Sequence, residues 1–498
     1  MATMSEKDQF PSSHGDDGNS ESWLIENSPQ IKAKIETECE ETSLIDRISQ
    51  LSDALIVQIL SRLSITDAFR TTILSKHWQY FWTSIDNLVY DNEDFSRSDS
   101  SMVHKFISLT DNVLPLLRTS SIKKCSLNFV FKHEDDVSYF PVIDKWLEFA
   151  VNKKVEGLYL NISYDIDVIE HDQPYSLPEV FCSSSILDDC VLNWTSLKSL
   201  TLESLLIWDE HIKQIMPNCP QLESFNLYGF CGFNRLHMTS PKCKRLKLID
   251  HYHPIGDWYP FEGDCCFEVV APYVEHLTIS GDFDYTEIEL KDLSSLDHAK
   301  LDLCSDEFDS MDEDILKDLL VSVISIWMMD QKLNVSLPLL ECRWLTISCY
   351  ISKVSFPMLD KLLRSTPNLE NLMIFPDIED HSFLQDEEYT KTLELYDLHL
   401  FEENIFKVSL QNLKNVKVMP FCSGTGTSKT VELDQFLKLI LEHAINLEKL
   451  VIVPKHKGCN SCFTNISQLM KCLLLFPRTS ISAVISSGPV TQNVFDSL

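Results

Sequence analysis

The chain has 498 residues, 44% of them hydrophobic, and its 75 acidic and 42 basic side chains give a formal net charge of −33. This charge argues against sequence-independent nucleic-acid binding, which needs Lys and Arg to neutralise phosphates, and against docking to anionic membranes. The hydrophobic fraction is typical of a globular protein, and the length suggests about three domains.

Residues 1–43 are polar, with ten acids and three bases, and this composition predicts a disordered acidic arm. The first residues lack the apolar core of a secretory signal, and the longest apolar run, 319–329, is too short to span a bilayer. We therefore expect a protein of the nucleus and/or cytoplasm. Its sixteen cysteines are expected to be reduced thiols that pack as small hydrophobes.

The segment 44–82 predicts three short helices. Apolar residues recur at helical spacing from Leu55 to Leu63, and Ser52 and Thr66 are placed to cap two successive helices. A third helix is expected to carry four large apolar residues, Leu74, Trp78, Phe81 and Trp82. About forty residues cannot bury all this apolar surface among themselves, so one hydrophobic face is left for a partner.

This segment resembles the plant form of the F-box, which reads Leu-Pro-Asp-x-Leu-Leu-x-x-Ile-Leu-Ser-x-Leu-Pro and later Leu-Ser-Lys-Arg-Trp. Ser52 and Ser64 stand in place of the two prolines, and His77 stands in place of the arginine. The resemblance implies docking onto the Skp-type adaptor of a cullin–RING ubiquitin ligase. An ordinary three-helix bundle is the alternative. The adaptor-binding residues that the resemblance implies are Leu51, Leu55, Ile59, Leu60, Leu63, Leu74, Trp78 and Trp82.

Charge supports a hydrophobic mode of docking for this segment. Residues 44–90 hold four acids and four bases, so they are neutral in a strongly acidic chain. After them, residues 91–101 are polar and predict a linker.

A repeated unit, apolar-x-x-apolar-x-apolar, dominates the rest of the chain. Leu197-Lys-Ser-Leu-Thr-Leu and Leu369-Glu-Asn-Leu-Met-Ile are typical, and successive units begin 21 to 46 residues apart. Each unit predicts a short strand and a helical or irregular return, and neighbouring units must stack to bury their apolar edges. This predicts a leucine-rich-repeat solenoid, with a compact α/β domain as the alternative. The units begin at Ile122, Val155, Leu197, Leu222, Cys243, Val274, Leu296, Cys342, Leu369, Leu413 and Leu447.

The C-terminal part carries a second resemblance. Val408 to Val418, a Gly-containing loop, Val431 to Ile452 and the later Phe476-Pro-Arg-Thr-Ser are similar to the FBD module found downstream of plant F-boxes. The intervening helix should bury one face. That face consists of Phe436, Leu437, Ile440, Leu441 and Ala444.

Two motifs could carry other chemistry, and both have simpler readings. Residues 423–430 end like a phosphate-binding loop but have Ser428 where that motif needs glycine, so a flexible loop is favoured. His456, Cys459, Cys462 and Cys472 could hold zinc, but only Cys459 and Cys462 have zinc-ligand spacing. Cys472 falls in an apolar helical run, where a cysteine is expected in the core, and a surface loop with free thiols is favoured over a zinc site. No acid–base pair or nucleophile elbow is evident, so we assign no catalytic residue, metal or cofactor.

The repeats offer a candidate binding surface. In each unit, the third and the fifth residue, such as Ser199 and Thr201 in the unit that begins at Leu197, should face the solenoid's inner surface. None of these 22 residues is acidic. This predicts a weakly basic, aromatic-edged patch for an acidic or phosphorylated partner or a small anion, although strands disfavour Asp and Glu in any case. The patch consists of Arg245, Lys247, His276, His298, Lys300 and Trp344.

Taken together, the sequence predicts an α/β chain of four parts: a disordered acidic arm (1–43), a three-helix F-box (44–90), a leucine-rich-repeat solenoid (91–403) and an FBD-like module that continues the solenoid (404–498). The resemblance to plant F-box/FBD/LRR proteins implies a non-catalytic substrate receptor of a Skp–cullin–F-box ubiquitin ligase. Its expected partners are the adaptor, through it a cullin, and an unknown target protein, with neither nucleic acid nor membrane. A scaffold whose F-box docks weakly and a small-ligand receptor are the alternatives.

Overall fold

The computed structural model describes thirteen stretches of the chain. They are 51–91, 107–131 without 109, 140–164, 194–251, 266–283, 287–302, 339–351, 356–377, 410–419, 430–453, 460–477, 479–480 and 484–487. The chain divides into two compact units, 1–55 and 56–498, and only 51–55 of the first is described. The predicted acidic arm therefore lies outside the described residues.

The F-box region has two α-helices followed by two 3-10 turns. Helix α2 spans Asp53–Leu60 and α3 spans Ile65–Arg70, while η1 spans Thr71–Ile73 and η2 spans Trp78–Ser84. The expected third helix is thus a 3-10 segment, and the β-branched residues of η1, which are poor helix formers, separate it from α3.

The cap of α3 also differs from the prediction. Ser64, not Thr66, is the N-cap: its side chain accepts a hydrogen bond from the Asp67 backbone N–H at 3.1 Å. Thr66 lies inside the helix, where its hydroxyl is 2.9 Å from that of Ser64. The serine that replaces a family proline therefore supplies the hydrogen-bond acceptor that starts α3.

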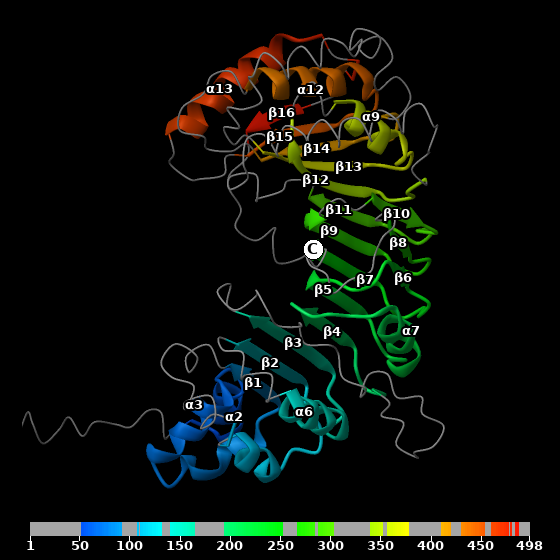
Figure 1. Ribbon diagram of the computed structural model, residues 1–498. Coiled ribbons are helices and arrows are strands. Elements are labelled where there is room, and N and C mark those ends of the chain that lie inside the picture. The colour runs from blue at the N-terminus through cyan, green and yellow to red at the C-terminus, as the bar shows by residue number, and fades with distance from the viewer. Residues whose placement is uncertain are drawn as a thin grey trace, which may run out of the picture. The chain divides into compact units, whose positions relative to one another are not determined.

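Thirteen parallel strands form one sheet, in which each strand pairs with the preceding and the following strand of that same sheet (Figure 1). The order is β1-β2-β3-β4-β5-β7-β9-β11-β12-β13-β14-β15-β16. In chain order the strands are β1 Asn87–Asp91, β2 Lys124–Phe131, β3 Gly157–Tyr164, β4 Ser199–Glu203, β5 Ser224–Phe230, β7 Arg245–His251, β9 His276–Phe283, β11 His298–Asp302, β12 Trp344–Tyr350, β13 Asn371–Asp377, β14 Asn415–Val418, β15 Lys449–Ile452 and β16 Val484–Ser487.

The repeat frame read from the sequence is confirmed strand by strand. All eleven predicted units have a strand, and each strand begins two residues after the first apolar position of its unit. All three apolar residues of every unit are buried; Leu197, Leu200 and Leu202 are an example. Parallel pairing keeps the apolar positions of neighbouring units in register on one face, where they form a continuous core. The β7–β9 pair has a register shift, but it falls after these positions, between Ile249 and His251.

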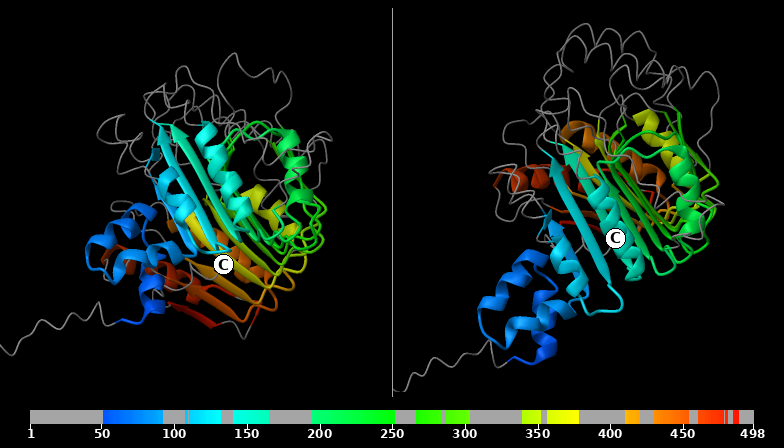
Figure 2. Two further views of the ribbon diagram at one scale, coloured as in Figure 1. Left: turned by 90° about the horizontal axis from the view of Figure 1, so that it is seen from below. Right: turned by 60° about the horizontal axis from the view of Figure 1, so that its bottom comes forward.

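Helices lie along one face of this sheet, as Figures 1 and 2 show. They are α6 Phe140–Asn152, α7 Asp209–Asn218, α9 Phe356–Arg364, α12 Thr430–His443 and α13 Asn460–Leu475, and the short 3-10 helix η3 covers Leu114–Leu116. None of the described helices has the length and apolarity that a membrane crossing requires.

Some returns between strands are themselves strands, which the sequence did not predict. A second, three-stranded parallel sheet has the order β10-β8-β6, from β6 Arg235–His237, β8 Cys266–Val270 and β10 Glu287–Lys291. Position 232 requires glycine, because its φ is +96° and Leu206 packs close to it. A Cβ atom at this position would lie 2.5 Å from Leu206 Cδ1.

Two strands of the main sheet were also missed. β1 lies inside the predicted F-box range, so the boundary at 90/91 cuts a strand, and its unit begins at Ile85. β16 was missed because Ser482 and Ser487 occupy apolar positions of its unit.

The C-terminal region continues the same sheet through β14, β15 and β16. The predicted helix is present as α12, and its five predicted core residues, from Phe436 to Ala444, are all buried. Cys472, expected in a core, is instead exposed on α13, whereas Cys125, Cys219, Cys243 and Cys342 are buried as predicted.

Candidate functional sites

The F-box region is unusually rich in exposed apolar side chains. Among the described residues, thirteen large hydrophobic side chains are exposed, and five of them fall between residues 55 and 80. They are Leu55, Ile59, Ile73, Leu74 and Tyr80. Ile73 is the most exposed of these five side chains, at 85%. Scattered exposed apolar residues are ordinary, but a cluster in so short a stretch is typical of an interaction surface.

The structure sorts the eight predicted adaptor-binding residues into two groups. Leu60, Trp78 and Trp82 are buried in the chain's own core, so their side chains hold the F-box together and are not free to contact a partner. The Trp82 ring meets Phe69 edge-on at 5.4 Å, and its Nε1–H donates to the Gln79 carbonyl at 3.1 Å.

The other five remain accessible. Leu55, Ile59 and Leu74 are exposed, and Leu51 and Leu63 are partly exposed. Ile73 and Tyr80 were not predicted. They lie within the 3-10 segments η1 and η2, which the sequence did not predict.

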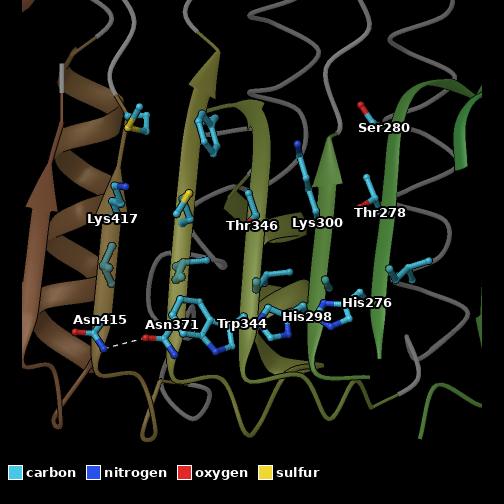
Figure 3. Close-up of a pocket in the computed structure, with 18 of the residues that line it drawn as sticks. His276, Thr278, Ser280, His298, Lys300, Trp344, Thr346, Asn371, Asn415 and Lys417 are labelled. Atoms are coloured by element: carbon cyan, nitrogen blue, oxygen red, sulfur yellow. Dashed lines mark hydrogen bonds between the residues drawn. The ribbon is translucent and has the colours of Figure 1, made fainter. Parts of the chain in front are cut away.

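The second candidate site is a hollow on the sheet face that points away from the helices. It has a volume of about 450 Å³ and lies across seven strands from β7 to β15 (Figure 3). The 23 described residues that line it include four lysines and two histidines but no carboxylate. Five of the six predicted patch residues line it: Lys247, His276, His298, Lys300 and Trp344. Arg245 does not, and its guanidinium lies 3.8 Å from Glu223 instead.

The strand register arranges the residues of the hollow in rows, because each repeat position lies beside the equivalent position of the neighbouring strand. The first row runs through His276, His298, Trp344, Asn371, Asn415 and Lys449. The second runs through Lys247, Thr278, Lys300, Thr346, Met373, Lys417 and Val451. The third row runs through Ile249, Ser280, Asp302, Ser348 and Phe375. Of these, Ile249, Ser280 and Phe375 line the hollow, together with Met419 and Val453, so the lining near the carboxyl ends of the strands is largely apolar.

The first row is ordered by ring stacking. The His276 and His298 rings are 4.5 Å apart, and Trp344 stacks on His298 at 5.6 Å with only 7° between the planes. Beyond them, Asn415 Nδ2 donates to Asn371 Oδ1 at 2.9 Å. Figure 3 shows these side chains together at the start of their strands, where they form one wall.

A ladder of charged residues immediately precedes the first row. Acids and bases mostly alternate from strand to strand, with Lys244–Glu275 at 3.0 Å, Arg343–Asp297 at 2.6 Å and Lys414–Glu370 at 2.9 Å. The full ladder is Asp86, Lys123, Glu156, Lys198, Glu223, Lys244, Glu275, Asp297, Arg343, Glu370, Lys414 and Glu448. Such exposed pairs add little stability individually, but alternation disfavours a slipped register.

The one break in this alternation lies beside the stacked histidines, where Glu275 and Asp297 are neighbours. Arg343 donates a hydrogen bond to Asp297 and lowers the pKa of that carboxyl. His298 Nδ1 lies 3.0 Å from Asp297 Oδ2, but burial and the neighbouring His276 still lower the pKa of the His298 imidazole. Burial therefore favours the uncharged form of the His298 imidazole.

The lysines of the second row differ from those of the ladder. Within the described part of the chain, no ion pair joins Lys247, Lys300 or Lys417 to a carboxylate, whereas Lys244 and Lys414, in the ladder, are both paired. Their ammonium groups are thus available to an anion from outside.

Acids do occur on this sheet face, in the third row, whose positions the sequence reading left out. They are Asp91, Glu203 and Asp302, each hydrogen-bonded by a neighbouring strand: Asn128 to Asp91, Tyr159 to Glu203 and Ser280 to Asp302. Strands of this protein therefore tolerate acids at this position, and general strand preference does not by itself explain why none is found among the described residues that line the hollow.

Sequence reasoning missed half of the hollow. Lys417 and Lys449 were in the predicted inward-facing set but were not joined to the patch, because only the middle strands were clustered. Met373, Phe375 and Met419 complete its apolar side.

The phosphate-loop-like segment and the zinc candidates fall largely outside the described residues. Residues 423–429, His456 and Cys459 lie outside the described residues. Among the described residues, no group of His, Cys, Asp and Glu could hold a metal ion.

Comparison with known proteins identifies the family. The family model for the At1g61320/AtMIF1 LRR domain matches residues 116–484, and the F-box domain model matches residues 48–90. The F-box/LRR-repeat protein At5g02910 of Arabidopsis thaliana is 26% identical over 66% of this chain and 72% of that protein. The F-box/FBD/LRR-repeat protein At4g26340 from the same plant is 28% identical over 52% of this chain and 60% of that protein.

The fold and the sites thus define a leucine-rich-repeat protein with an N-terminal F-box. The chain belongs to the plant family of F-box/LRR-repeat proteins.

Proposed function

We propose that this chain is the substrate-recognition subunit of a Skp–cullin–F-box ubiquitin ligase, acting in the nucleus and/or cytoplasm. The F-box would dock on a Skp-type adaptor and, through it, on a cullin, while the repeats hold a target protein. The chain itself would be non-catalytic and would act by bringing the target close to the ubiquitin-loaded enzyme. Residues 404–498 would form the FBD-like end of the repeat array.

The observation that carries this proposal is the exposed apolar set of the F-box region in a locally neutral sequence. Ile59, Ile73, Leu74 and Tyr80 present apolar surface, and the nearby charges Arg70 and Asp67 pair with each other at 2.8 Å. Burying such a surface against an adaptor is favourable, at about 25 cal/mol per Å² of apolar area.

The test is co-purification of the full chain with a recombinant Skp-type adaptor. Ile73→Lys should abolish the complex, because it places a charge in an apolar interface. Leu475→Lys is the matched control, since Leu475 is 87% exposed in helix α13 and Ile73 is 85% exposed. Full adaptor binding by Ile73→Lys and Leu74→Lys would refute docking through this surface.

The hollow supports a second candidate function, that of a small-ligand receptor, because its volume is in the range of drug-sized ligand sites, roughly 300–1,000 Å³. A small organic anion that binds only the folded chain would raise its thermal midpoint. Stabilisation by such an anion, lost in Lys300→Glu, would favour this function over target binding.

A further inference from the structure

The spacing of the second-row lysines deepens the proposed function, on which this inference rests, by specifying what the repeats bind. Lys247, Lys300 and Lys417 occupy one repeat position in β7, β11 and β14. Two strand steps separate the first pair and three separate the second. At about 4.8 Å per step, the lysines stand roughly 10 Å and then 14 Å apart across the sheet.

Their surroundings select an anionic occupant. No carboxylate belongs to the described residues that line the hollow, and no described carboxylate pairs with these lysines, in a chain whose net charge is −33. Charge complementarity of this kind guides partner choice and association rate more than affinity.

The apolar side of the hollow adds a second requirement. Met373 lies in the lysine row between Lys300 and Lys417, and Phe375 and Met419 lie beside it. An occupant that covers this stretch gains by placing an apolar side chain there, since methionine adapts its shape to what it contacts.

Length then distinguishes a chain segment from a compact ligand. The outer lysines are five strand steps apart, or about 24 Å. An extended peptide advances about 3.3 Å per residue, so roughly seven residues reach from one to the other. A single drug-sized anion does not contact all three.

We infer that the hollow binds an extended acidic segment of a target protein that runs across the strands. Its anionic groups, carboxylate or phosphoryl, are spaced by about three and then four residues to meet Lys247, Lys300 and Lys417, and an apolar residue between the second and third meets Met373. The stacked wall of His276, His298 and Trp344 borders this path at β9, β11 and β12.

The test uses the full chain and fluorescein-labelled synthetic peptides in an anisotropy titration. The first peptide has aspartates at the spacing above with a leucine between the second and third. The second has phosphoserines in their place, which separates the two sources of charge. The third has the same composition as the first with its aspartates adjacent.

The spaced peptides should bind more tightly than the adjacent one, and affinity should fall as salt is added. Lys300→Glu and Lys417→Glu should each weaken binding by at least about tenfold, because like charges then face each other. Lys124→Glu is the matched control: Lys124 holds the first-row position of β2, outside the hollow, and this variant should bind as the wild type does.

Several outcomes would overturn the inference. They are equal binding of spaced and adjacent peptides, no binding of any peptide, or equal loss in Lys124→Glu. Binding of free acetate or inorganic phosphate as tight as that of the peptides would assign the lysines to a small anion. Peptide binding that emerges only after the acids of 379–403 are changed to amides would show that the chain's own acidic run is the occupant. The same preparation is tested for adaptor binding, so a chain that binds adaptor but no peptide refutes only this inference.

Discussion

The serine that begins helix α3 allows a sharp test of how this F-box departs from its family's pattern. Ser64 accepts a hydrogen bond from the Asp67 N–H at 3.1 Å, so Ser64→Ala removes one N-cap. Loss of such a cap costs about 1 kcal/mol. Proline, the family's residue here, cannot cap with a side chain, but it has a different advantage.

Ser64 already has the backbone that proline needs. Its φ of −59° lies within proline's range, and none of the described backbone hydrogen bonds uses its N–H. Ser64→Pro therefore loses the cap but restricts the unfolded chain, which is worth about 0.4–1 kcal/mol. We expect Ser64→Pro to be within about 0.5 kcal/mol of the wild type and Ser64→Ala to be about 1 kcal/mol less stable locally.

Hydrogen exchange of the α3 amides in the full chain measures this local free energy. A loss of about 1 kcal/mol corresponds to roughly fivefold faster exchange in Ser64→Ala. Amides of α12, far away in the sequence, serve as the internal reference. Unchanged exchange in Ser64→Ala, or faster exchange in Ser64→Pro than in Ser64→Ala, would refute the reasoning.

Three further predictions concern stability. Leu60→Ala, at a fully buried position of α2, should lower the free energy of unfolding by about 2–5 kcal/mol. Ile59→Ala, at a position that is 43% exposed, should lower it by less than about 1 kcal/mol. Denaturant unfolding followed by F-box tryptophan fluorescence measures both losses, and equal losses would contradict the prediction. Gly232→Ala should destabilise by about 1–3 kcal/mol or more, because φ is +96° and the new Cβ would meet Leu206 Cδ1 at 2.5 Å, while Gly157→Ala, with contacts no closer than 3.5 Å, is the control in the same thermal scan. Hydrogen bonds from Lys291 and His237 lower the pKa of Glu268 to about 2. The ionised Glu268 therefore stabilises the fold above its unfolded pKa of about 4.3, and this stabilisation is lost as the pH falls towards 2. Glu268→Gln should flatten the dependence of the thermal midpoint on pH between these values, and an unchanged slope would exclude the stabilisation.

The repeat frame is the part of the fold that the sequence predicted in most detail. Leu222-Glu-Ser-Phe-Asn-Leu predicts a strand, the face that is buried and the residues that point away from the core, because side chains alternate with a period of two. The same rule failed at β16, where serines occupy apolar positions. Packing against β15 and the buried Ser480, which donates to the Leu447 carbonyl at 2.6 Å, holds that strand in place.

The F-box shows where local pattern stops being informative. Helical spacing made Leu60 and Leu74 look alike, yet one is fully buried and the other is 63% exposed. The difference arises because the chain leaves the α-helical path at Thr71 and enters a 3-10 turn, which changes the direction in which each later side chain points.

For this protein, the sequence alone determined that an F-box is followed by leucine-rich repeats and which repeat positions face inward, because both follow from local motifs and from the local period of apolar residues. The basic character of the middle repeats follows from the residue types at those inward-facing positions. Only the tertiary structure decided which of those positions meet. Parallel pairing in constant register places Lys300 in one row with Lys417, 117 positions further along the chain, and stacks His276, His298 and Trp344 into a wall. Such contacts depend on strand order and register, and no short stretch of sequence contains either.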